Sequence, residues 1–233
     1  TKADGSAEQV LTNMVTQDGD VAITVTDAAK VSQAERIANL TTGDVVFEGG
    51  ITDELAKLAS NGVITQGLTT IVAHDSDVEI TVSDSDLNGD DVSDLNAVTT
   101  ATTGKVTATL SGNRDKLLSL TSPNTTDDLT ITVDESVTVE QGDKLAKATN
   151  KDVITFTGGV DDSLDKMVKA DNSGNESIVV ITTKDTDVKL NVNDGVNGNG
   201  LVANDDIVAQ LNNLGKLTTG ELVAKVNGTS LKL

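Results

Sequence analysis

The sequence predicts an α/β solenoid, in which coils of one strand and one short helix, about 24 residues each, stack into a parallel β-sheet. Three observations predict this class. An acid-bracketed strand occurs four times, segments with helical spacing lie between the strands, and the 233 residues include two Phe and no Trp or Tyr. A core without large aromatics needs regular aliphatic packing, which stacked coils supply. A parallel β-helix-like, all-β solenoid is the alternative.

The strand copies are DVAITVTD, DVEITVSD, DLTITVDE and DVKLNVND, which start at residues 20, 77, 128 and 187. In the first copy Val21, Ile23 and Val25 face one way and the residues between them face the other. The starts are 57, 51 and 59 residues apart, which indicates a repeat. We therefore predict a capping helix region over 1–17 and one solenoid domain over 18–233. Its expected units are 18–74, 75–126, 127–184 and 185–233.

Short helices are expected at VSQAERIA (31–38), DELAKLA (53–59) and DDSLDKMVKA (161–170), where apolar residues recur at helical spacing. A TTG or equivalent turn then leads into a second strand at 40–49, 102–112, 149–159 and 217–228. The turn glycine is expected to supply a positive φ that ends the helix. The stretches TTIVAHDSDVEITV (69–82) and SIVVITTKDTDVKLNV (177–192) are expected to be two strands that meet at an acidic corner. NGTSLKL (227–233) is expected to pair with another subunit.

The acidic composition limits the partners. With 37 acidic against 17 basic residues the formal charge is −20, and phosphate binding needs a basic patch, so neither nucleic acid nor an anionic membrane is expected. No apolar run approaches the roughly 20 residues that span a bilayer, so no membrane insertion is expected. His74 is the only histidine, cysteine is absent, and no hydrolase or phosphate-loop motif occurs, so we predict that the chain is not an enzyme.

Acidic residues supply the candidate metal ligands, and calcium is the expected ion. DSDLNGDD (84–91) alternates oxygen-bearing side chains ahead of a glycine, like the start of an EF-type loop, although Leu95 stands where a bidentate Glu is needed. Pairs of acids also precede the strands, where stacking would bring like charges together unless cations bridge them. The candidate ligands are Asp84, Asp86, Asn88, Asp90, Asp75, Asp77, Asp185 and Asp187. The alternative is that these acids form turns and helix caps.

The run TTGKVTATLSGNRDKLLSLTSPNTTDDLTITVDESVTV (102–139) resembles a unit of the long extracellular Thr/Val/Asp-rich repeat proteins of cyanobacteria and other bacteria. Repeats of that family typically read as a TTG turn, a TVTATLSG-like strand, a DLLAL-like helix and an LTITV strand, and weaker matches continue through most of 18–233. The resemblance implies a cell-surface location and an S-layer or adhesin-like role, sometimes with calcium. The glycine-aspartate nonapeptides of calcium β-rolls are absent, so their calcium mechanism is not implied.

These observations predict a non-enzymatic structural module of an extracellular surface assembly. The module is expected to associate with itself or with neighbouring repeats of a longer chain, with calcium as a candidate stabiliser. One alternative is a structural protein of a marine phage virion, such as a decoration, fibre or tail protein. The other is a glycan- or surface-binding module, in which exposed threonine rows and acidic corners contact the ligand.

Overall fold

The computed structural model describes residues 8–121, 124, 126–149, 154–194 and 200–227. The chain divides into two compact units, of which unit 1 comprises Thr1–Leu110 and Ser119–Thr130 and unit 2 comprises Ser111–Leu118 and Ile131–Leu233. The described residues form ten α-helices and several parallel sheets, with no closed barrel among them. The mixed α/β class is therefore confirmed, and the all-β alternative is wrong.

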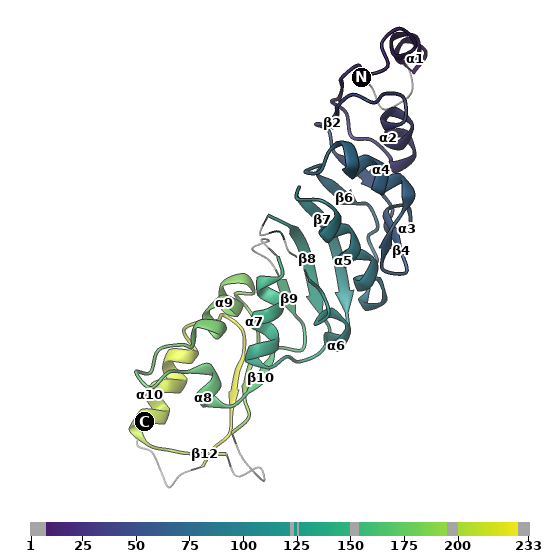
Figure 1. Ribbon diagram of the computed structural model, residues 1–233. Helices are drawn as coiled ribbons and strands as arrows, with labels where there is room; N and C mark the ends of the chain where they lie inside the picture. Colours follow the sequence, from purple (N-terminus) through teal and green to yellow (C-terminus); the bar gives the residue numbers. More distant parts are fainter. Residues whose placement is uncertain (1–7, 122–123, 125, 150–153, 195–199, 228–233) are drawn as a thin grey trace. The chain divides into compact units, whose positions relative to one another are not determined.

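Unit 1 contains a series of short strands and helices (Figure 1). Its first elements are α1 (Glu8–Gln17), β1 (Ile23–Val25), α2 (Val31–Ala38), β2 (Val45–Phe47), β3 (Ile51–Asp53), α3 (Leu55–Leu58), β4 (Ala59–Ser60) and β5 (Val63–Ile64). They are followed by α4 (Gln66–His74), β6 (Ile80–Val82), the 3-10 helix η1 (Gly89–Asp91), α5 (Val92–Ala101) and β7 (Val106–Gly112). The predicted helices at 31–38 and 53–59 are thus confirmed as α2 and α3.

Unit 2 contains nearly the same series. Its elements are α6 (Arg114–Leu117), β8 (Asp128–Val133), α7 (Val139–Lys147), β9 (Ile154–Phe156), β10 (Val160–Asp162), α8 (Leu164–Met167), α9 (Glu176–Lys184), β11 (Leu190–Val192), β12 (Leu201–Val202), α10 (Asp205–Leu214), β13 (Leu222–Ala224) and β14 (Val226–Asn227). The division between the units passes through β7 and β8. The predicted helix within 161–170 is confirmed as α8, whereas residues 228–233 of the expected pairing tail lie outside the described residues.

The parallel pairing is the same in both units. In unit 1, β1 pairs with β2 and β6 lies between β3 and β7, while in unit 2 β8 pairs with β9 and β11 lies between β10 and β13. The paired residues Ile23 and Val45 are 22 positions apart, and Leu190 and Leu222 are 32 apart. Coil length therefore varies around and above the expected value of about 24 residues, because some coils carry an extra helix or hairpin.

The four copies of the bracketed strand occupy two kinds of position. The first and third, β1 and β8, pair with the strand about one short coil later, whereas the second and fourth, β6 and β11, are central strands of three. Ile23 is therefore equivalent to Ile131, and Ile80 to Leu190, with each pair about 110 residues apart. The structural repeat is one unit of two unlike halves.

Aliphatic side chains fill the core in both units. Inward positions of the strands are buried and outward positions are polar or exposed, as in the pattern of β1, where Ile23 and Val25 are buried and Thr24 is exposed. Figure 1 shows α2 beside α4 in unit 1, and α7 beside α9 in unit 2. The helices α4 and α9 contribute side chains that are 0% exposed, among them Ile71 and Ile181.

The expected strand pairs at 69–82 and 177–192 are wrong in their first halves, which form α4 and α9. These segments are rich in β-branched residues, which favour strands on propensity alone. Two local features start the helices instead: Thr65 accepts a hydrogen bond from the N–H of Leu68, and Asn175 accepts one from Ser177. Burial of the helical face then outweighs the small propensity cost.

Candidate functional site

The TTG turns attach each second strand to the bracketed strand beside it. Three turns in the described residues share one geometry, in which the first threonine hydroxyl donates to a strand carbonyl and accepts from the turn glycine N–H. We term this arrangement the threonine clamp. The hydroxyl-to-carbonyl distance is 2.7 Å in each clamp, joining Thr41 to Val21, Thr102 to Val78, and Thr218 to Val188. The glycine N–H lies 2.9 Å from the threonine oxygen in each clamp.

The turn glycine is needed for a different reason from the one that the sequence suggested. Gly43, Gly104 and Gly220 do not have a positive φ. A Cβ built on Gly104 would lie 2.1 Å from the carbonyl oxygen of Asp77, and the other two turns show the same approach. The backbone of the neighbouring strand therefore excludes any side chain there. The positive-φ prediction for this glycine is wrong.

Aspartates from one coil accept backbone N–H groups of an earlier coil, and we term these contacts aspartate braces. Asp75 Oδ2 accepts from the N–H of Phe47 at 2.6 Å, and Asp185 Oδ2 accepts from Phe156 at 2.7 Å. Both aspartates are only 7% exposed. A buried carboxylate that accepts a strand N–H satisfies a donor that would otherwise be costly to bury.

Other braces cap helices from a distance. The N-cap positions of α2, α3 and α8 provide no side-chain oxygen for the first turn. Carboxylates from strand ends accept the first helical N–H instead, which satisfies a donor that the helix cannot. These contacts join Asp53 to Val31 (3.0 Å), Asp162 to Val139 (3.0 Å), Asp84 to Leu55 (2.6 Å) and Asp194 to Leu164 (2.7 Å). Each unit therefore has the same braces at equivalent positions.

The buried braces have a titration signature. Burial raises the pKa of Asp75, a hydrogen bond with the Asp77 carboxyl raises it further, and the N–H of Phe47 acts in the opposite direction. Burial and Asp187 likewise raise the pKa of Asp185. Each predicted pair thus places two carboxyl groups side by side, which favours either a shared proton or a bridging cation.

The predicted EF-type loop is used mainly for backbone contacts. Asp84 braces α3, and Asn88 accepts from the N–H of Asp90 at 2.9 Å to start η1. Asp91 closes the turn by accepting from the N–H of Asn88 at 2.8 Å, while Asp86 is exposed. These contacts agree with the turn-and-cap alternative.

Calcium at the predicted ligands stays a prediction. Within the described ranges, no three His, Cys, Asp or Glu residues gather in a group that could hold a metal. Calcium takes six to eight oxygen ligands, so the pair Asp75 and Asp77, or the pair Asp185 and Asp187, would have to be completed by carbonyl groups or water. The carboxylate pairs fit a cation better than the residues at 84–90 do, because Asn88 and Asp84 already accept N–H groups.

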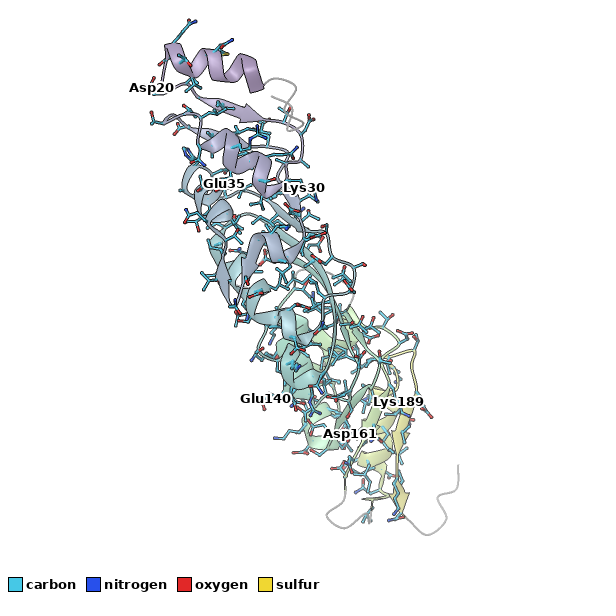
Figure 2. All side chains as sticks on the ribbon, turned by 90° about the vertical axis from the view of Figure 1, so that its right-hand side faces the viewer. Asp20, Lys30, Glu35, Glu140, Asp161 and Lys189 are labelled. Carbon is cyan, nitrogen blue, oxygen red and sulfur yellow. The ribbon has the colours of Figure 1, made fainter. Side chains whose placement is uncertain are left out.

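Two equivalent clefts lie beside the first turns of α2 and α7, with volumes of about 730 Å³ in unit 1 and 380 Å³ in unit 2. Figure 2 labels Lys30 and Glu35, which line the cleft of unit 1. Two carboxylates and one lysine recur in both clefts: Glu35, Asp53 and Lys57 in unit 1, and Asp143, Asp162 and Lys166 in unit 2. Sequence reasoning missed these clefts, although the recurrence of these residues about 110 positions apart was a signal.

The chain matches no family model, no curated protein and no solved structure. In the part of the chain that the structure describes, no helix is both long enough and apolar enough to cross a bilayer. The functional argument therefore depends on the clamps, the braces and the two faces described below.

Proposed function

We propose that this chain is a non-enzymatic structural module of an extracellular surface assembly, of the S-layer or adhesin-like kind. The observation that carries the proposal is that equivalent aspartates of both units serve as braces. Asp53, Asp75 and Asp84 in unit 1 correspond to Asp162, Asp185 and Asp194 in unit 2. Repetition of structural contacts rather than of a reactive constellation is typical of a module whose purpose is its own shape.

The finer architecture that we propose is a solenoid of stacked coils. Parallel registers within each unit support it, as do the three threonine clamps, which join each TTG turn to the strand beside it. In such an architecture each coil contacts its neighbours, and stability is the sum of many similar interfaces. Self-association extends the same interface from one molecule to the next.

Calcium enters the proposal through the paired carboxylates. Asp75 with Asp77, and Asp185 with Asp187, hold like charges close together, and a cation there would remove the repulsion. A calcium-stabilised assembly would then gain rigidity where calcium is abundant, as it is outside cells.

The test is multi-angle light scattering with electron microscopy on the purified chain over a range of concentrations, with calcium and after chelation. Growth in mass to sheets or filaments supports the assembly, and its loss on chelation supports the role of calcium. A monomer under every condition would contradict the self-associating module. Closed particles or tail-like tubes would favour the virion alternative instead.

A surface-binding module is the second candidate, because threonines form a row on the outer face of unit 1. Thr52 pairs with Thr81, and Thr81 pairs with Thr107, so their side chains repeat at the strand spacing of about 4.8 Å. None of the three is buried. Specific retention on a glycan array that is lost in Thr81→Val would favour this candidate over the structural module.

A further inference from the structure

A supersecondary unit of helix, Asp-x-Asp corner and strand occurs three times in the described residues. It comprises α4 with β6, α9 with β11, and α1 with β1. In each, the N–H of the first corner aspartate donates to the carbonyl four residues earlier, and the donor–acceptor pairs are Asp75 to Ile71 (2.9 Å), Asp185 to Ile181 (2.8 Å) and Asp18 to Met14 (3.0 Å). The second corner aspartate raises the pKa of the first in all three. The three units are therefore structurally equivalent.

Two of the three units are docked and the third is not. The helices α4 and α9 pack on α2 and α7, which bury Ile71 and Ile181 to 0% exposure. Their aspartates brace the strands β2 and β9. By contrast Met14, at the equivalent position of α1, is 48% exposed, and Asp18 is exposed as well. The α1 unit thus presents an apolar side chain and a carboxylate of the kind that the other two units bury.

The face formed by α10 and β13 offers the matching half. It is equivalent to α5 and β7, where the N–H of Val106 donates to Asp127 at 2.9 Å. At the corresponding position, the N–H of Leu222 points away from β11 in this parallel register and has no partner among the described residues. The side chain of Asn96 bonds the segment that covers α5, whereas its equivalent, Asn212, is exposed.

Burial of the apolar side chains differs in the same way. Leu95 on α5 and Val106 on β7 are both 0% exposed. Their equivalents Leu211 on α10 and Leu222 on β13 are only half-buried. The face of α10 and β13 therefore has the composition of an interior coil surface, with fewer covering atoms among the described residues.

We propose that α1 and Asp18 of one molecule dock on α10 and β13 of a second copy of this chain. Met14 packs against the half-buried side chains of α10, and the Asp18 carboxylate accepts the N–H of Leu222. The template is the contact that α4 and Asp75 already make within unit 1, so the interface continues an existing one. Because the two surfaces differ, the contact is heterologous and repeats head to tail. This inference rests on the self-association in the proposed function and identifies the faces that produce it.

The test uses one variant for each face. Met14→Lys places a charge on the exposed α1 position. Leu222→Pro removes the outward N–H and leaves the donors that face β11, a change that an edge strand tolerates. Val208→Lys on α10 is a second variant of that face if the proline unfolds β13, and circular dichroism checks the fold of each. Val63→Lys is the matched control, because Val63 is 65% exposed and lies on neither face.

The expected result is that wild type and Val63→Lys grow in mass with concentration, while Met14→Lys and Leu222→Pro each remain at 24.0 kDa. An equimolar mixture of the two face variants should form a dimer and nothing larger, because it contains one intact face of each kind. If both variants assemble like wild type, the faces are wrong while the proposed function stands. If the two remain monomers when mixed, head-to-tail contact is refuted. If wild type never associates, self-association itself fails.

Discussion

Replacing Asp75 with alanine is expected to lower the free energy of unfolding by about 1–3 kcal/mol, the cost of leaving a buried N–H unsatisfied. The brace to the N–H of Phe47 is 2.6 Å long, and Asp75 is only 7% exposed, so water cannot easily replace the carboxylate. Asp75→Asn should cost much less, because its amide oxygen accepts the same N–H and its NH2 group can donate to Asp77. The pair of variants therefore separates the brace from the charge.

The assay is urea unfolding at pH 7 in calcium-free buffer and again with calcium, followed by circular dichroism. Asp185→Ala and Asp185→Asn provide an independent copy of the experiment in unit 2, because the brace to Phe156 is equivalent. Stability unchanged in both alanine variants would refute the brace. If the asparagine variants lose as much as the alanine variants, and only in calcium, the carboxylate pairs hold the ion rather than a shared proton.

Three further outcomes are expected. Because the folded-state pKa of Asp75 and Asp185 is raised, the native chain binds more protons than the unfolded chain above the ordinary value of about 3.9, so the free energy of unfolding should fall as pH rises through that window up to the folded-state pKa; urea titrations of the double Asp→Asn variant should show a shallower fall. Gly104→Ala should destabilise by about 1–3 kcal/mol because its Cβ would lie 2.1 Å from a backbone oxygen, whereas Gly19→Ala, which meets nothing within 4 Å, should be near neutral in thermal melts. Thr218→Val, which removes both clamp bonds, should cost about 1–3 kcal/mol, and a melt like wild type would contradict the clamp.

Much of the local structure could be predicted from the sequence because it depends on short-range periodicity. The alternation around Ile23 gave β1, and the helical spacing from Val31 gave α2. The helices α4 and α9 were not predictable in this way, since their runs of isoleucine, valine and threonine favour strands. Packing of α4 on α2 decides the outcome there, and no window of ten residues contains that contact.

The candidate site was predictable in composition but not in role. The sequence singled out Asp75 and Asp185 as recurrent acids, and the structure places each beside its partner aspartate. Their hydrogen-bond partners, Phe47 and Phe156, lie 28 and 29 residues earlier, beyond the reach of any local pattern. The repeat itself was resolved at half its true period, because the bracketed strands look alike although they occupy two kinds of position.

The use of aspartate for these braces also explains how a chain with a formal charge of −20 can hold closely packed coils. A carboxylate has acceptors and no donors, so it is suited to the outward N–H groups that every strand edge presents. Each brace joins residues of nearby coils within one unit, as Asp127 does with Val106, 21 residues earlier. Since no brace within the described residues depends on a distant coil, a further unit needs only the same contact again. Duplication within the chain and association between chains then follow from one interface.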